Sequence, residues 1–178
     1  MYKKQFEIRW SDVDANRHLA NSAYVNFMSH TRVAFFEDHG FSLSNLAKYD
    51  VSPVIFYEHI YYFKEAFLGT PITVSLEVLG LSEDGMFFLL EHNFYNQKGE
   101  NLANCEILGA WINLKTRSLT ALPENFKKEM ETFPKSKNFK TITKEDTRKF
   151  GKKPINLRAL NKFFICFFWK ENEFKLTR

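Results

Sequence analysis

A short stretch near the start of the chain concentrates side chains that can do acid–base and nucleophilic chemistry. Asp12, Asp14, Asn16, Arg17 and His18 lie close together, just before a predicted helix. A carboxylate can act as a general base toward water or attack directly as a nucleophile, and a histidine carries protons near neutral pH. The free N–H groups and partial positive charge of a helix N-terminus polarise a carbonyl and stabilise the oxyanion formed on attack. These residue types indicate a site for attack on a carbonyl group.

The same stretch has a structural alternative, because Asp, Asn and Ser side chains before a helix often only cap it. The polar groups between Asp12 and His18 exceed what one cap needs, which favours a site. Asp12 itself is interpreted as a turn former or a surface charge. Five further residues are interpreted as structural or surface groups: His30, His39, Glu58, His59 and His92. Their spacing does not resemble a motif such as HExxH, so no metal site is predicted.

A long helix and a set of strands must position this stretch. Residues 5–10 alternate in polarity like a half-buried strand, and from residue 22 to 39 the period becomes helical. Four strand-like segments follow at residues 54–64, 72–78, 86–95 and 102–114, and a short helix is expected at 124–131. Asp84-Gly85 and Lys98-Gly99 are hairpin turn signals, so the four strands are expected to form a meander. The pattern predicts an α+β fold with a sheet wrapped around a central helix.

The long helix is predicted from one broad, largely apolar stripe. Its members follow i, i+3, i+4 spacing and are Tyr24, Phe27, Met28, Thr31 and Phe35. Asn21 or Ser22 is expected to be the N-cap, and Gly40 is expected to end the helix.

The net charge of +4 is unevenly distributed along the 178 residues. Residues 1–134 carry 12 Lys and Arg against 17 Asp and Glu, whereas residues 135–178 carry 13 against 4. Residues 135–153 have few core-forming side chains and are interpreted as a linker or exposed arm. The apolar run Phe163–Trp169 would aggregate if exposed, so it is expected to pack on the body or on a neighbouring subunit. The chain is therefore divided into a domain of residues 1–134 and a basic, aromatic C-terminal extension of residues 135–178.

Composition and targeting signals favour a cytoplasmic protein. Hydrophobic residues make up 44% of the chain and aromatic residues 17%, which is a globular composition. No apolar run approaches the ~18 to 20 residues needed to span a bilayer, and the N-terminus has no secretory signal pattern. Cys105 and Cys166 lack metal-ligand spacing and are interpreted as buried, reduced thiols.

The stretch from Asp14 to Asn21, with Tyr24 following, resembles a known family motif. It is similar to the Asp-x-Asn-x-His-Val-Asn-Asn-x-x-Tyr motif of acyl-ACP thioesterases. From Asp12 onward it also resembles the Asp-x-Asp-x-x-Gly-His-Val-Asn-Asn motif of bacterial acyl-CoA thioesterases in the 4-hydroxybenzoyl-CoA thioesterase-like group. Residues 53–69 resemble the family's second strand, and residues 109–123 resemble its last strand and exit.

This resemblance implies a hotdog fold, in which a curved antiparallel sheet of about five strands wraps around the long helix. The implied site lies at the interface of a homodimer or homotetramer. The implied reaction is hydrolysis of an acyl-CoA or acyl-carrier-protein thioester to a free acid and a thiol. Coenzyme A or phosphopantetheine would be part of the substrate, and no separate cofactor is expected.

The resemblance also implies roles for individual residues. Asp14 matches the catalytic carboxylate, and Asn16 and His18 would orient the water or the acyl carbonyl, with His18 protonating the leaving thiolate. Glu65 falls where the acyl-ACP branch carries a Glu followed by a Cys. The next residue here is Ala66, so a cysteine nucleophile is absent and a water or carboxylate mechanism is expected.

Substrate binding is assigned by the same resemblance to Arg17, Asn21 and Tyr24. Two positions depart from the family pattern. Arg17 stands where many bacterial relatives have Gly, which would narrow the substrate entrance. Ala20 replaces the first of two Asn residues and removes a polar group near the helix start.

Two alternatives to a thioesterase stay open. A hotdog dehydratase usually carries a His-Phe-Pro-type motif, which this sequence lacks. A non-catalytic acyl-thioester-binding regulator is the second alternative, since fold alone does not fix function. The basic arm lacks glycine-rich loops and a helix-turn-helix pattern, so no nucleic-acid partner is expected. If the arm has a partner, an acidic carrier protein or the phosphates of CoA fit its charge as well as nucleic acid does.

Overall fold

The computed structural model describes residues 1–157, so the expected packing of Phe163–Trp169 and the state of Cys166 lie outside the described residues. Along the chain the helices and strands are β1 (Tyr2–Phe6), α1 (Asn21–Asp38), α2 (Leu43–Ala47), β2 (Val51–Tyr62), β3 (Ile72–Leu81), β4 (Phe87–Tyr95), β5 (Asn101–Asn113), α3 (Glu124–Glu131) and β6 (Lys135–Thr141). Two short 3-10 turns, Trp10–Asp12 and Lys144–Arg148, complete the order. None of the helices in this part of the chain is both long and apolar enough to cross a membrane.

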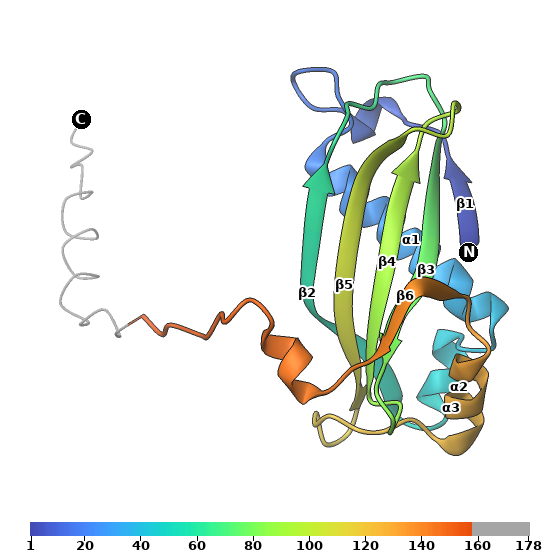
Figure 1. Cartoon of the computed structure of the whole chain (residues 1–178), viewed down its shortest axis with the longest axis vertical. Coiled ribbons are helices and arrows are strands. Elements are labelled where there is room, and N and C mark those ends of the chain that lie inside the picture. Colours follow the sequence, from blue (N-terminus) through green and yellow to red (C-terminus); the bar gives the residue numbers. More distant parts are fainter. Residues whose placement is uncertain (158–178) are drawn as a thin grey trace, which may run out of the picture.

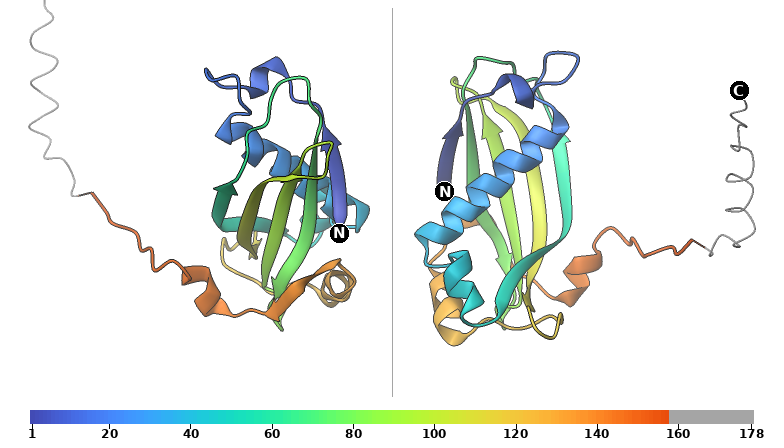
Figure 2. Two further views of the ribbon diagram at one scale, coloured as in Figure 1. Left: turned by 45° about the horizontal axis from the view of Figure 1, so that its top comes forward. Right: turned by 180° about the vertical axis from the view of Figure 1, so that it is seen from behind.

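The strands form one six-stranded sheet with the order β1-β3-β4-β5-β2, and β6 pairs with β3 in parallel. All pairs along the main path are antiparallel. The sheet curves around α1, which crosses its concave face diagonally (Figures 1 and 2). The predicted α+β hotdog architecture is therefore confirmed, with β6 as a sixth strand.

The expected meander is correct only for β3, β4 and β5. Gly85 and Gly99 have φ angles of +69° and +77°, as the two hairpin turns require. β2 instead pairs with β5, from Val51 opposite Asn113 to Tyr62 opposite Ala103, and forms one edge of the sheet. The link from β2 to β3 carries no two-residue turn signal. The prediction that β2 lies beside β3 therefore had no local feature to support it.

The first strand is shorter than predicted. β1 ends at Phe6, and Trp10, the last apolar residue of the alternating segment 5–10, is 79% exposed. The carboxylate of Asp12 accepts a hydrogen bond from the Arg9 backbone N–H at 2.9 Å and closes a 3-10 turn. This turn redirects the chain before the alternation reaches Trp10.

Helix α1 confirms the predicted stripe, because all five of its members are buried. Gly40, with φ of +78°, follows the last turn as expected. The predicted N-cap is wrong, because Ala20 and not Asn21 or Ser22 occupies that position. The Ala20 N–H donates to the Asp12 carbonyl at 2.8 Å, and its own carbonyl accepts from Ala23 at 2.9 Å, so the chain enters the helix one residue early.

The interpretation of residues 135–153 as a linker is wrong for its first part. Residues 135–141 form β6, and Ile142 is 1% exposed in a second apolar cluster on the outer face of the sheet. Gly80 permits this approach, because a Cβ there would lie 2.6 Å from Ile142 Cγ2 and 2.9 Å from the Lys140 carbonyl oxygen. A strand of largely polar residues was missed because its stabilising contacts come from distant parts of the chain.

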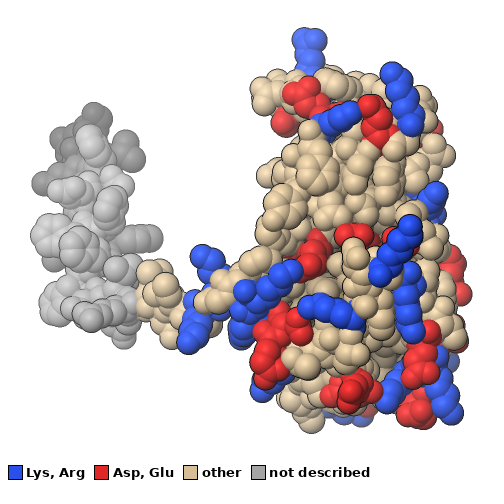
Figure 3. Space-filling model, viewed as in Figure 1, with Lys and Arg blue, Asp and Glu red and all other residues tan. Residues whose placement is uncertain are grey.

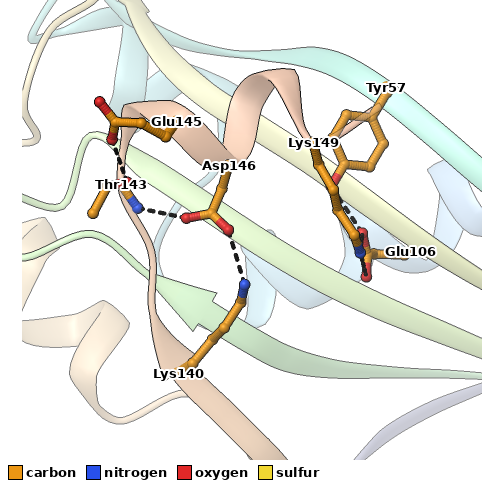
Figure 4. A network of polar contacts seen from close by, with 7 residues as sticks. All are labelled: Tyr57, Glu106, Lys140, Thr143, Glu145, Asp146 and Lys149. Atoms are coloured by element: carbon orange, nitrogen blue, oxygen red, sulfur yellow. Dashed lines mark hydrogen bonds and ion pairs between the residues drawn. The ribbon is translucent and has the colours of Figure 1, made fainter. Parts of the chain in front are cut away.

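Residues 142–150, here called the outer strap, continue across the outer face of the sheet toward β2 (Figure 1). Lys149 Nζ lies 2.9 and 3.0 Å from the two carboxylate oxygens of Glu106 on β5, and the Tyr57 hydroxyl donates to the same carboxylate at 2.8 Å (Figure 4). Lys140 Nζ and the Thr143 backbone N–H both contact the Asp146 carboxylate (Figure 4). The strap is thus held by the buried side chain of Ile142 and by the ion pairs of Asp146 and Lys149.

We predict that Ile142→Ala lowers the free energy of unfolding by about 2 to 5 kcal/mol, because it leaves a cavity in the outer cluster. Ile155→Ala is the matched control, since Ile155 is 93% exposed, and it should leave stability unchanged. Urea denaturation of the full chain measures both. Equal stability of the two variants would show that the strap does not pack as described.

Candidate active site

The stretch between Asp14 and His18 is a tight turn. The Asp14 N–H donates to the His18 carbonyl at 2.9 Å, and the Arg17 N–H donates to the Asp14 carbonyl at 3.0 Å. Arg17 has a φ of 66°, in the left-handed region where glycine is favoured. This conformation gives a physical reason for the Gly that the resembled bacterial motif carries at the corresponding place.

The backbone of this turn holds the Asp14 carboxylate. Asp14 Oδ1 accepts hydrogen bonds from the N–H groups of Asn16, at 2.8 Å, and His18, at 3.1 Å. Within residues 1–157, Asp14 Oδ2 has no hydrogen-bond partner, and the side chain is exposed. One oxygen is therefore fixed and the other is available to a water molecule or a ligand.

The segment after β2 forms the opposite side of the site. The Leu19 N–H donates to the Ala66 carbonyl at 2.8 Å, and His18 forms an isolated antiparallel bridge with Phe67. This pairing places His18 Nε2 3.4 Å from Glu65 Oε1. The His18 ring also meets the Phe67 ring edge-on, with centroids 5.1 Å apart. Glu65, distant in sequence, is thereby brought beside the histidine.

A pocket of about 470 Å³ opens between these segments. Its walls are formed by Asp14, His18, Leu19, Asn21, Tyr24, Tyr62, Phe63, Lys64, Glu65 and Ala66. Five of the predicted site residues therefore share one pocket, whereas Asn16 and Arg17 lie outside its walls. Tyr62, Phe63 and Lys64 were not predicted as site residues, because in the sequence they are only the end of an aromatic strand. The structure shows that this end lies beside the loop that carries Asp14 and His18.

The N-terminus of α1 faces this pocket through Asn21. Ala20 at the N-cap offers no side-chain acceptor, and the Ser22 N–H donates to Asn21 Oδ1 at 2.9 Å. The Asn21 N–H finds no acceptor among the described residues. One backbone donor at the positive end of the helix thus stays available to an oxygen of a bound ligand.

Asp12 stabilises the loop that carries the site residues. It is a turn former as predicted, but its side chain is buried rather than on the surface, with 5% exposure. The Arg9 guanidinium donates to both carboxylate oxygens at 3.0 Å, and this bonding holds the pKa of Asp12 below its usual range. His92 on β4 is also structural, because its Nδ1 lies 2.8 Å from the Ser75 carbonyl and burial lowers its pKa to about 3.

We predict that Asp12→Asn destabilises the protein near pH 7 by about 1 to 3 kcal/mol, because a buried charged acceptor is lost. The folded pKa of Asp12 is depressed, so its stabilisation is present above the unfolded value of about 3.9 and is lost as pH falls through the lower folded value. The stability gap between wild type and variant should therefore narrow on acidification. Urea denaturation across a pH series measures it, and a gap independent of pH would contradict this account.

The fold and the pocket define a hotdog protein of the thioesterase type, and the family comparison agrees. The model of the thioesterase-like superfamily matches residues 8–130, so the chain belongs to this superfamily. The comparison with curated protein sequences finds no match.

Solved structures similar to this chain share its fold. A hypothetical protein from Staphylococcus aureus in complex with CoA has a TM-score of 0.70 and 24% identity, covering 88% of this chain and 95% of that one. A probable thioesterase from Escherichia coli has a TM-score of 0.63 and 22% identity, covering 74% and 97%. A 1,4-dihydroxy-2-naphthoyl-CoA thioesterase from Synechocystis has a TM-score of 0.66 and 15% identity, covering 74% and 96%.

Proposed function

We propose that this protein hydrolyses acyl thioesters of coenzyme A, with Asp14 as the general base. The observation that carries the proposal is the Asp14 carboxylate, which two backbone N–H groups hold by one oxygen at the edge of a pocket. The same pocket contains His18 and the first residue of α1. A base, a proton donor and an oxyanion donor thus surround one space large enough for a thioester.

In the proposed reaction, Asp14 Oδ2 takes a proton from a water molecule as the water oxygen attacks the thioester carbonyl carbon. The Asn21 N–H, at the positive end of α1, stabilises the oxyanion that develops on the carbonyl oxygen. The carbon–sulfur bond then breaks, and His18 donates a proton to the leaving thiolate. Glu65, whose Oε1 lies 3.4 Å from His18 Nε2, orients the imidazole for this transfer.

Of the two predicted residues outside the pocket walls, Asn16 takes a different role in this proposal and Arg17 keeps its role. Asn16 acts through its backbone N–H, which fixes Asp14, because its side chain is exposed outside the pocket walls. Arg17 lies in the same turn and would narrow the entrance. The CoA complex of the similar Staphylococcus aureus protein supports CoA over a carrier protein as the thiol carrier. Carrier-protein esters are the second substrate class to assay.

The proposal includes a homodimer paired along β2. This edge strand has 12 residues, and its exposed apolar side chains, continuing just past its end, include Ile55, Phe56, Tyr61, Tyr62 and Phe63, between 40% and 56% exposed. An uncharged area covers the upper outer face of the sheet on the side of β2 (Figure 3). A long apolar edge strand invites pairing with another chain. Because Tyr62 and Phe63 line the pocket, pairing there would place each pocket at the contact between subunits.

Asp14→Asn should lower kcat/KM for acyl-CoA hydrolysis by a factor of about 100 to 10,000, because the proton acceptor is lost. Thiol release from acetyl- to palmitoyl-CoA and benzoyl-CoA measures it. Asp50→Asn is the matched control, since Asp50 is an acidic residue outside the pocket walls whose φ of 54° Asn tolerates.

Near-normal turnover in the Asp14 variant would exclude the assigned base. A wild type that binds these esters without turning them over would favour the non-catalytic regulator instead. A single turnover in water labelled with ¹⁸O tests for the nucleophilic route, because label is incorporated into Asp14 only if an anhydride forms and water attacks it at the Asp14 carboxyl carbon. Direct attack of water activated by Asp14 puts the label in the product acid alone.

Tyr61→Lys combined with Phe63→Lys should convert the dimer into a monomer, because lysines oppose pairing on edge strands. Light scattering of the eluting protein measures the mass. The matched control Leu43→Lys/Leu119→Lys changes two exposed apolar residues outside β2 and should preserve the dimer. A monomeric wild type would contradict the proposed pairing.

A further inference from the structure

A charged pair lies between α1 and β2 beneath the curve of the sheet. Arg32 Nη2 is 3.3 Å from Glu58 Oε1, and the two side chains are only 10% and 24% exposed. Arg32 Nη2 also lies 3.0 Å from Ser29 Oγ. Arg32 Nη1 is buried and has no hydrogen-bond partner among the described residues. A guanidinium with an unbonded N–H is an unusual occupant of a hydrophobic core.

The groups around this pair are neutral. His92 is fully buried, and its pKa is lowered to about 3 by burial and then by the charge of Arg32. Burial, followed by the charge of Glu58, raises the pKa of the Cys105 thiol to about 12. Burial also lowers the pKa of Arg32. The Arg32–Glu58 pair is therefore a local polar barrier among neutral and apolar side chains.

Along α1 this barrier lies in line with the pocket. Tyr24, Met28 and Arg32 follow one i, i+4 ridge of the helix. Tyr24 is a pocket wall and Met28 is fully buried. The helix rises about 12 Å along its axis from Tyr24 to Arg32.

β2 presents a matching row. Glu58, Ile60 and Tyr62 share one face of the strand and stand opposite the fully buried Ile107, Cys105 and Ala103 of β5, without a register shift between them. Their side chains therefore point toward the core side of the sheet.

The ends of the two rows meet. The rings of Tyr24 and Tyr62 touch edge-on at the pocket, with centroids 5.1 Å apart, and Arg32 pairs with Glu58 at the other end. Between these ends lie Met28 and Ile60, which are both apolar. The α1–β2 seam thus runs from the pocket, past apolar side chains, to an ion pair.

We infer that the Arg32–Glu58 pair is the specificity-determining inner end of the acyl pocket and limits the acyl group to short or medium chains. The inference rests on the proposed function, because it takes the acyl group to enter beside Asp14. Each methylene buried in the seam gains about 0.8 kcal/mol. A chain that reaches the ion pair gains nothing further, because it must displace or desolvate paired charges. At about 1.2 Å per bond of an extended chain, the helix rise of about 12 Å from Tyr24 to Arg32 corresponds to the length of roughly ten carbons.

Binding of S-alkyl-CoA thioethers, which cannot be hydrolysed, tests the inference separately from catalysis. Calorimetric titration of the wild type with ethyl- to hexadecyl-CoA should show affinity rising up to about fourfold per methylene and levelling near ten carbons. Affinity that keeps rising through hexadecyl-CoA, or no binding of any thioether, would overturn the inference. A wild type that shows this levelling but hydrolyses no thioester would reject the proposed function and retain the inference.

The double variant Arg32→Met/Glu58→Leu should raise the ratio of hexadecyl to decyl affinity at least tenfold. Replacing a buried ion pair by apolar residues of similar volume is often neutral or stabilising, whereas removing one partner is not. Lys140→Met/Asp146→Leu removes an ion pair of the strap region and is the matched control, which should leave the ratio unchanged. An unchanged ratio in a folded Arg32/Glu58 variant would show that the pair is structural only. If that variant does not fold, the wild-type series alone decides.

Discussion

The antiparallel contact between residues 18–19 and residues 66–67 is the constraint on which the pocket depends. The hydrogen bond from Leu19 to Ala66 and the bridge from His18 to Phe67 fasten the loop before α1 to the segment after β2. Because α1 begins directly after this loop, its N-terminus is fixed by the same contact. The turn from Asp14 to His18 fixes the Asp14 carboxylate relative to His18. The contact between residues 18–19 and 66–67 then fixes this whole turn relative to the opposite wall of the pocket.

The parts of the fold that were predictable have local causes. The stripe of α1, the two hairpin turns and helix α3 follow from periodicity and from turn residues within a few positions of each other. The position of β2 at an edge and the pairing of β6 with β3 depend on contacts between distant segments. The approach of Ile142 to Gly80 is one such contact, and neither residue signals it alone.

The candidate site divides in the same way. Asp14 and His18 were identifiable because one loop contains both, and Glu65 was identifiable only through a family resemblance. Lys64 lines the pocket, but its residue type alone did not single it out. Even in the structure its ion pair with Glu100 looks like an ordinary surface contact. Helix α1 contributes both to the candidate site and to the core, because its first turn offers a backbone donor and a later turn carries the buried Arg32.

The outer strap has a consequence for how copies of this chain can assemble. It crosses the lower part of the face of the sheet opposite α1 in Figure 1, with Ile142 buried and Lys149 bonded to Glu106. A second sheet stacked on that face would have to lift the strap, expose an isoleucine and separate an ion pair. The chain has thus already used part of this face for its own packing, and assembly by back-to-back stacking of sheets carries a penalty that side-by-side contact along β2 avoids.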